Sequence, residues 1–404
     1  MSPIAKTLLP TLLCLPLLAT QVHGAVLQSA PKITFDDAGT LYIADWKAAR
    51  VYAVHVPQAS KAPAGPFNLH DVQASVARAL KVKPSMVRFE DLAVQPGSNM
   101  AYVSVTLRDR AAVVAIDAGG RVREFPTSNL KTFARIGDGP APGLRFWRDL
   151  PAPALTVTDM KTHDGKLYLA GLSNRNFAST LRVFDLPLRG AARTATVEMY
   201  HPVHNQIETR APIRAITFAV VDGVPNMVAA YTCTPLVLIP LDAITDGAHI
   251  TGQTIGEMGW GSAPVGMVSY KLGESGNEMV LLANSSRSAD LMAVADIARQ
   301  ARLPGLHDPI SVPDQPYAGI KAAMAPMAAV MRFDNLDAKL LLALRRDGPS
   351  GAMQLVSIPK GAYLRLSDFV NEYDFEDYTY PPNDTFRVLH KAGRALEGYP
   401  ELAR

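Results

Sequence analysis

The sequence predicts an all-β protein, a β-propeller with six blades, and three observations carry this prediction. One apolar unit recurs along the chain, its middle strands are apolar on both faces, and Pro and Gly are frequent, at 31 and 28 of 404 residues. Sheets that pack radially against neighbouring sheets bury both faces and expose only short edges. Many short strands joined by turns also need frequent Pro and Gly.

The repeat appears in six segments that share one plan: an apolar strand, a polar turn, a strongly apolar second strand, a polar loop and a third strand. The segments are 32–56, 89–125, 157–188, 215–244, 266–297 and 326–359. Their second strands begin near Leu41, Ala101, Leu167, Met227, Met279 and Leu340. The spacing is roughly 50 to 66 residues, which suits propeller blades that carry insertions. Seven blades is the alternative, with residues 25–31 and the tail 362–404 closing the ring or supplying part of a seventh.

Two segments depart from the repeat. In residues 68–84, Val72, Val76 and Leu80 recur at helical spacing, Asn68 can cap the N-terminus and Pro84 ends the run, so a short helical insertion is expected. The tail 362–404 is expected to close the ring, and its mixture of acids and aromatics can also form an arm that binds a partner.

Residues 1–25 have the features of a signal peptide. Lys6 precedes an apolar run from Thr7 to Thr20, and small residues follow at Gly24 and Ala25. This pattern predicts export and cleavage near Gly24 or Ala25, which leaves residues 26–404 as a single periplasmic or secreted propeller domain. The mature chain has no second segment long enough to cross a bilayer.

Charge and cysteine content narrow the classes of partner. Lys plus Arg number 40 and Asp plus Glu 37, interspersed along the chain, so no electrostatic footprint for nucleic acid is expected. Cys233 is the only cysteine outside the signal peptide, and its apolar setting in a second strand predicts a structural role. The chain has no CxxCH motif and therefore no covalently attached haem of its own.

Several polar residues occupy equivalent places in the repeat, where propeller strands approach the central channel. Before inner strands stand Glu90, Asp91, Asp159 and Arg214, and after second strands stand Asn174 and Asn284. Polar groups that converge at a concave mouth predict a binding site. The alternative is that each Asp or Asn bonds backbone groups locally.

A second candidate is the loop "YHPVHNQIETR" at 200–210, which holds His201, His204, Glu208 and Arg210. Imidazole and carboxylate suit zinc or a similar metal, although the spacing is not that of an HExxH helix. Arg210 and Arg214 can instead bind an anionic ligand, and an ordinary polar loop is the third possibility. Because the loop leads into an inner strand, it is expected at the same end of the propeller as Glu90, Asp91, Asp159 and Arg214. An acid is expected within ion-pair reach of Arg214.

The unit "DDAGTLYIADWKAARVYAV" at 36–54 resembles the NHL and SMP-30/gluconolactonase-type propellers, in which a Gly turn precedes "LYIAD" and an Arg–Val strand follows. The whole chain also resembles a group of exported bacterial propellers. The lactonase resemblance implies a divalent metal on the axis, held by Glu, Asn and Asp from separate blades. Glu90, Asn174 and Asn284 can imitate that set, but the family's remaining motifs do not match around them. Their oxygen ligands would suit calcium.

The leading functional expectation is an exported propeller that binds a small molecule or a periplasmic protein at the channel mouth, because no complete catalytic constellation is present. A metal-dependent hydrolase or lactonase, or an enzyme like streptogramin lyase, is one alternative. An accessory subunit of a periplasmic redox enzyme is another. Fold alone does not choose among them.

Overall fold

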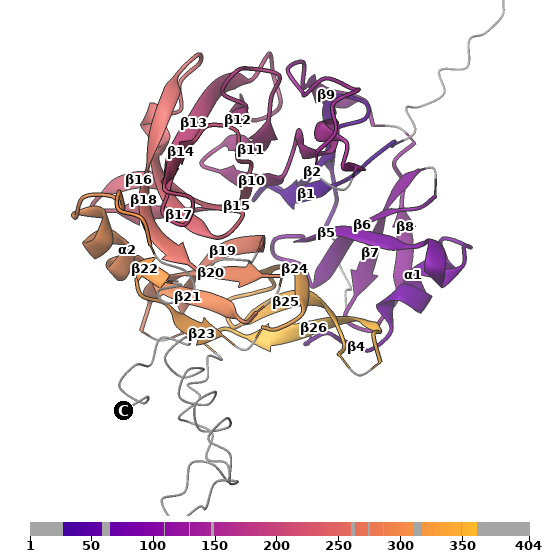
Figure 1. The fold of residues 1–404 in the computed structure, drawn as a ribbon. Helices are drawn as coiled ribbons and strands as arrows, with labels where there is room; N and C mark the ends of the chain where they lie inside the picture. Colours follow the sequence, from indigo (N-terminus) through magenta and orange to yellow (C-terminus); the bar gives the residue numbers. More distant parts are fainter. Residues whose placement is uncertain are drawn as a thin grey trace, which may run out of the picture.

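The computed structural model describes residues 27–361, except for 59–64, 109, 129, 147–148, 260–262, 274, 286, 311–316, 326 and 349. The predicted signal peptide and the tail 362–404 lie outside the described residues. Small antiparallel sheets are arranged in a ring around a central axis (Figure 1). The predicted β-propeller fold is therefore confirmed.

Four sheets have four strands each, in the orders β1-β2-β3-β9, β5-β6-β7-β8, β19-β20-β21-β23 and β24-β25-β26-β4. A ten-stranded sheet contains two further antiparallel runs, β10 to β13 and β15 to β18. These runs are joined where β13 and β18 pair in parallel. Two short strands, β14 (Gln206–Glu208) and β22 (Tyr317–Gly319), extend this sheet at β13 and β18.

The strands fall into four positions between the axis and the rim. The innermost strands are β1 (Lys32–Phe35), β5 (Arg88–Val94), β10 (Asp159–His163), β15 (Ile213–Val221), β19 (Pro264–Leu272) and β24 (Val330–Asn335). The second strands are β2 (Thr40–Asp45), β6 (Met100–Thr106), β11 (Lys166–Leu172), β16 (Val224–Tyr231), β20 (Asn277–Asn284) and β25 (Leu340–Arg346). The third strands are β3 (Arg50–His55), β7 (Ala111–Asp117), β12 (Ser179–Asp185), β17 (Pro235–Pro240), β21 (Ala289–Ala293) and β26 (Met353–Pro359). The outermost strands are β9 (Thr132–Arg135), β8 (Val122–Phe125), β13 (Arg193–His201), β18 (His249–Met258), β23 (Ala323–Ala325) and β4 (Asn68–Leu69).

The units do not follow one another around the ring in chain order. The innermost strands contact one another in the cycle β1, β5, β24, β19, β15, β10 and back to β1 (Figure 1). The second unit along the chain, β5 to β8, therefore lies between the first unit and the last. Before building it the chain adds β4 to the last unit, and after it the chain returns to the first unit as β9.

Both faces of the second strands are buried because each sheet packs between two others. In β6, Ala101, Val103 and Val105 face one hydrophobic core, while Tyr102 faces a different core on the opposite side of the sheet. A strand that is buried on both faces has a continuous run of apolar residues, and the second strands show this pattern in the sequence.

The 68–84 insertion is only partly helical. Helix α1 spans Val72–Ala79, and the side chain of Asp71 accepts a hydrogen bond from the Ala74 backbone N–H at 3.0 Å. Asp71 is therefore the N-cap, and the expectation of Asn68 was wrong because Asn68 pairs with Val356 in the edge of the last sheet. Val72 and Val76 lie on the buried face of the helix and are fully buried.

A second helix, α2 (Val294–Ala301), follows β21 directly and packs on β15, β18, β20 and β21. The sequence repeat 266–297 predicts a strand up to residue 297, which is wrong because the chain is helical from Val294. Its apolar residues Val294, Ile297, Ala298 and Ala301 recur at helical spacing, and that pattern could have identified it.

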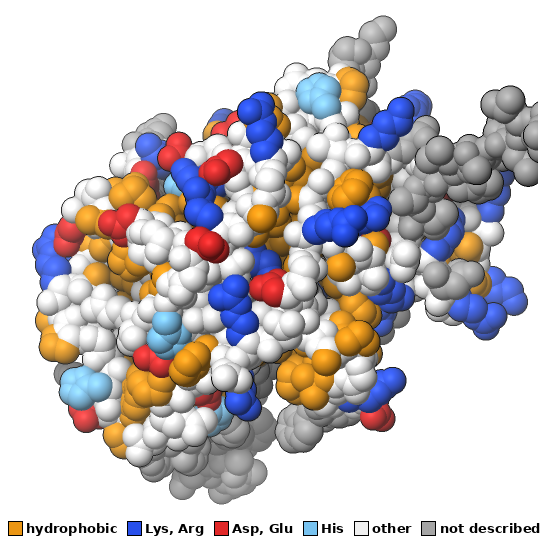
Figure 2. All heavy atoms as spheres, turned by 90° about the horizontal axis from the view of Figure 1, so that it is seen from above, with side chains coloured by type: hydrophobic (Ala, Val, Ile, Leu, Met, Phe, Trp, Pro, Cys, Tyr) orange, Lys and Arg blue, Asp and Glu red, His pale blue; other side chains and the backbone are white. Residues whose placement is uncertain are grey.

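In the described part of the chain, no helix is long and apolar enough to span a bilayer. Figure 2 shows one side of the molecule, where basic and acidic side chains are interspersed with hydrophobic and uncharged ones. That face carries no continuous field of a single charge.

Candidate functional site

Aspartates near the axis join each inner strand to its neighbour. The Asp91 carboxylate of β5 accepts a hydrogen bond from the Ile33 backbone N–H of β1 at 2.9 Å. Asp159 of β10 accepts from Ile216 of β15 at 2.8 Å, and Asp334 of β24 accepts from Val94 of β5 at 2.9 Å. Neighbouring inner strands belong to different antiparallel units, and these carboxylates pair backbone N–H groups that no ladder partner reaches. Asp91 and Asp159 thus bond backbone groups of a neighbouring strand, and Asp159 also accepts locally from the Met160 backbone N–H at 2.9 Å.

A buried ion cluster surrounds two of these aspartates. Lys32 Nζ lies 3.7 Å from Asp91 Oδ1 and 3.5 Å from Asp159 Oδ1, and Arg332 Nε lies 3.4 Å from Asp91 Oδ1. Burial lowers the pKa of Lys32, although both carboxylates oppose the shift. Burial also raises the pKa of Asp91 against the opposing charges of Lys32 and Arg332. Desolvation is therefore the dominant effect on both groups.

Arg214 is half-buried and does not form the expected ion pair. No carboxylate among the described residues lies within 4.0 Å of its guanidinium, because Asp91 and Asp159 are taken by Lys32 and by backbone N–H groups. Burial and the neighbouring charge of Arg332 lower the pKa of Arg214, while Asp159 acts against them.

The predicted oxygen set for calcium is dispersed. Glu90 Oε1 accepts hydrogen bonds from Nε and Nη2 of Arg88, at 2.8 and 2.7 Å. Asn174 is exposed between β11 and β12, and its backbone N–H donates to the Asp138 carbonyl. Asn284 is buried and donates its side-chain amide to Asp290 at 2.9 Å. No described contact joins Glu90, Asn174 and Asn284.

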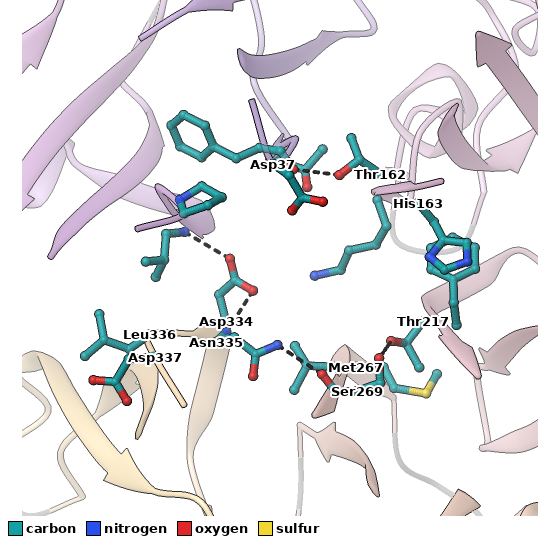
Figure 3. Close-up of a pocket in the computed structure, with 17 residues that line it drawn as sticks. Asp37, Thr162, His163, Thr217, Met267, Ser269, Asp334, Asn335, Leu336 and Asp337 are labelled. Atoms are coloured by element: carbon teal, nitrogen blue, oxygen red, sulfur yellow. Dashed lines mark hydrogen bonds between the residues drawn. The ribbon is translucent and has the colours of Figure 1, made fainter. Parts of the chain in front are cut away.

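A cavity of about 390 Å³ lies on the axis, and all six innermost strands contribute to it (Figure 3). Its lining comes from the middle and C-terminal ends of these strands. The ten candidates from the sequence do not line it: the axial ones among them lie nearer the N-terminal ends of the inner strands. Thr34, Lys161, His163, Thr217, Asp334 and Asn335 are among the polar residues that do.

Two residues that line this cavity have an uncommitted polar group, which is buried in Asn335 and faces the cavity in Lys161. Asn335 donates its side-chain amide to the Ser269 carbonyl at 3.1 Å, but its buried Oδ1 has no partner among the described residues. Lys161 Nζ has no hydrogen bond or ion pair within 4.0 Å in the described part of the chain. Burial works against the charge on Lys161, yet Asp334, Asp159 and Asp91 outweigh it and raise the pKa. The ammonium group is therefore charged and free to donate.

An aromatic pair forms one wall of the cavity. The ring of His163 stacks on Phe218 with centroids 4.3 Å apart and planes 12° apart. Burial lowers the pKa of His163, which favours the neutral imidazole. The wall is therefore flat, aromatic and uncharged.

The 200–210 segment forms a hairpin that gathers three candidates. Strand β13 ends at His201, residues 202–205 turn, and β14 returns with Glu208 opposite Met199. Glu208 Oε1 lies 2.9 Å from His201 Nδ1 and 2.5 Å from His204 Nδ1. Burial raises the pKa of Glu208, but the hydrogen bonds from the two histidines outweigh it and lower the pKa to about 2. The fourth candidate, Arg210, is exposed and donates to the Asn176 carbonyl at 3.2 Å.

A buried carboxyl group, which the sequence did not point to, lies behind this hairpin. Glu257 Oε2, near the end of β18, is 3.6 Å from His201 Nε2, and neither atom has a hydrogen-bond partner among the described residues. Burial raises the pKa of Glu257 to about 8. Thr234 donates its hydroxyl to the other carboxyl oxygen, Oε1, at 3.3 Å.

The placement of Cys233 in a second strand was wrong. Strand β16 ends at Tyr231, and Cys233 lies half-buried in the turn that follows, with φ of 65°. Thr234 has φ of 68°, a left-handed conformation that is uncommon for a β-branched residue. The single proton of the Thr234 hydroxyl is shared between two acceptors, the Gly259 carbonyl at 2.6 Å and Glu257 Oε1 at 3.3 Å, and this contact holds the turn in place.

No family model and no curated protein matches this chain. Among solved structures, similarity is found to BBS1N in a crystal structure of its complex with ARL6DN, soaked with lead, at 11% identity and a TM-score of 0.29. That alignment covers 85% of this chain and 96% of the other. A chain in a crystal structure of the mitotic checkpoint complex is similar at 8% identity and a TM-score of 0.29, over 88% of this chain and 99% of its own length.

Proposed function

We propose that this chain is an exported six-bladed propeller that binds a small, neutral, hydroxyl-rich molecule in its axial cavity. The observation that carries the proposal is Lys161 Nζ, a charged donor in the cavity that has no partner among the described residues. The six blades are the four separate sheets and the two four-stranded runs of the ten-stranded sheet. The contact cycle of six innermost strands supports this count.

The cavity's chemistry selects the ligand class. A hydroxyl group both donates and accepts, so it can accept from Lys161 Nζ and donate to a carboxylate of the lining, such as Asp37 or Asp337. Three carboxylates line the cavity, Asp37, Asp334 and Asp337, against the single ammonium of Lys161. This balance disfavours anions. The volume of about 390 Å³ lies within the usual range for small-molecule sites, and the aromatic wall suits the C–H face of a sugar ring.

The binding function is favoured over a metal-dependent hydrolase by the separation of the two candidate sites. The His201, His204 and Glu208 cluster lies at the outermost strand β13, and none of its residues lines the axial cavity. A metal held there would not contact a molecule bound on the axis.

We expect Lys161→Met to weaken binding of a neutral mono- or disaccharide by about 10- to 100-fold, the range for losing a hydrogen bond to a charged group. Asn335→Leu is expected to weaken it by less than about 3-fold, because the buried Asn335 Oδ1 does not face the ligand. Calorimetric titration against neutral sugars, uronic acids and amino sugars provides the measurement. Asn174→Ala, an exposed change away from the cavity, is the control and should leave binding unchanged. Binding of uronic acids alone, or unchanged affinity in Lys161→Met, would contradict the proposal.

Export is tested separately. When the full chain is expressed in a bacterium with a periplasm, we expect mature protein in the periplasmic or secreted fraction, beginning at Ala25 or Val26. N-terminal sequencing of the purified protein gives the answer. Retention of Met1 in the soluble, folded protein would rule out the signal-peptide interpretation.

A further inference from the structure

The His201, His204 and Glu208 cluster presents three ligand atoms of the types that bind zinc. One atom from each side chain lies within 4.8 Å of the others. A tetrahedral zinc ion, with ligands at about 2.0–2.1 Å, would separate them by about 3.3 Å. Glu208 Oε1 is 2.9 and 2.5 Å from the two Nδ1 atoms, so outward shifts of a few tenths of an ångström to about 1 Å would admit an ion.

The hairpin holds these side chains together before any ion is bound. The imidazole rings of His201 and His204 have centroids 4.0 Å apart. The His204 backbone N–H donates to the His201 carbonyl at 3.2 Å, which fixes the turn between them. His201 is buried, whereas the His204 side chain is 45% exposed. The cluster is therefore anchored on its inner side and open to solvent on its outer side.

The far side of His201 supplies independent support. Histidines that bind a metal through one ring nitrogen usually donate the other N–H to a carboxylate, which fixes the tautomer and the ring orientation. His201 Nε2 and Glu257 Oε2 are 3.6 Å apart, buried, and lack other hydrogen-bond partners in the described residues. With an ion on Nδ1, the proton of His201 resides on Nε2 and faces Glu257. The strained turn at Cys233 and Thr234 holds that carboxylate in place through the Thr234 hydroxyl.

We propose that His201 Nδ1, His204 Nδ1 and Glu208 Oε1 bind a zinc ion, with Glu257 as the residue that positions His201. Two imidazoles and one carboxylate form a three-ligand set that leaves the fourth tetrahedral position for water. The exposure of His204 places that position at the surface. The site lies apart from the axial cavity, and its occupancy does not depend on the sugar-binding proposal.

The test is calorimetric titration of the metal-depleted, full mature chain with ZnCl₂, repeated with CoCl₂ while visible absorption is recorded. One site per chain is expected, with the d–d bands of tetrahedral cobalt and a higher Tm in the presence of zinc. His204→Ala removes an exposed ligand without opening the core, and we expect at least a 100-fold loss of zinc affinity. Glu257→Gln is expected to reduce affinity by about 10- to 100-fold, as seen for residues that orient a ligand.

The matched control is His249→Ala. His249 Nε2 also contacts a carboxylate, Glu198 Oε2 at 3.1 Å, and it lies on β18 of the same sheet, but no second histidine among the described residues joins that pair. This variant and Cys233→Ser should bind zinc as the unaltered chain does, because neither residue belongs to the cluster. Asn335→Leu should also leave zinc affinity unchanged, which separates this site from the cavity.

Three results would overturn the proposal. The first is the absence of a stoichiometric zinc site in the unaltered chain. The second is equal zinc affinity in His204→Ala, measured on protein whose circular dichroism and metal-free Tm are unchanged. The third is loss of zinc binding in Cys233→Ser, which would move the ion to the thiol.

Discussion

Asp91→Ala is expected to lower the free energy of unfolding by about 3–5 kcal/mol, the usual result of removing one partner from a buried ion pair. The change leaves Lys32 with only Asp159, leaves Arg332 without its carboxylate and leaves the Ile33 backbone N–H unpaired. Because the side chains of Lys32 and Asp91 are 8% and 10% exposed, water cannot readily replace the lost partner. Urea unfolding followed by circular dichroism measures the change.

Two further variants show whether charge or hydrogen bonding is responsible. Asp91→Asn keeps an acceptor for the Ile33 N–H and should cost less than Asp91→Ala. Adding Lys32→Met to Asp91→Ala should recover part of the loss, because the unpaired charge is then removed. Asp185→Ala breaks an exposed pair with Arg193 and should cost less than about 1 kcal/mol. If Asp91→Ala cost no more than this control, the axial cluster would not contribute to holding the ring together.

Arg182→Met is the second substitution with a large expected effect, also about 3–5 kcal/mol. The Arg182 side chain is 1% exposed, and its Nε lies 2.6 Å from Asp138 Oδ1. Its two terminal nitrogens donate to the carbonyls of Thr156 and Leu172 at 3.0 and 2.8 Å. Methionine fills the space but leaves two carbonyls and a carboxylate oxygen without a donor. The measurement is again the free energy of unfolding in urea.

Arg193→Met is the matched control on the same sheet, because Arg193 is 40% exposed and pairs with Asp185. It should change stability by less than about 1 kcal/mol. Arg182→Lys should fall between the two, since a lysine retains the charge but not the planar fork that reaches three acceptors. Equal stability of Arg182→Met and Arg193→Met would show that water satisfies the acceptors around Arg182.

The strands were predictable because burial on both faces leaves a local signal. The second strands β2, β6, β11, β16, β20 and β25 all begin within three residues of the positions read from the repeat. Asn68 shows the limit of this approach. Its sequence context is that of a helix cap, but its backbone completes the edge of β26, nearly 290 residues away in the chain. A partner at that separation leaves no periodic pattern around Asn68.

The candidate sites were predictable to different degrees. His201, His204 and Glu208 stood out because histidines are rare in this chain, yet only the hairpin brings His204 back to Glu208. Glu257 looked unremarkable in the sequence, because its importance comes from a contact between β13 and β18. The sequence did not point to the cavity residues Lys161 and Asn335, because the polar positions that recur in the repeat stand before the inner strands, whereas the cavity lies towards the strand ends.

The sequence by itself determined that this chain builds repeated antiparallel β units with strands buried on both faces, since that information lies in local apolar patterns. Only the tertiary structure decided the order of the units around the axis, with the β5 unit between the first and the last. It also decided which polar groups form hydrogen bonds with neighbouring strands, as Asp91 does, and which have no partner among the described residues, as is the case for Lys161. The physical reason is that sheet packing and side-chain bonds between units join residues that are far apart in the sequence. The local sequence pattern around such a residue does not show which distant residue it will contact.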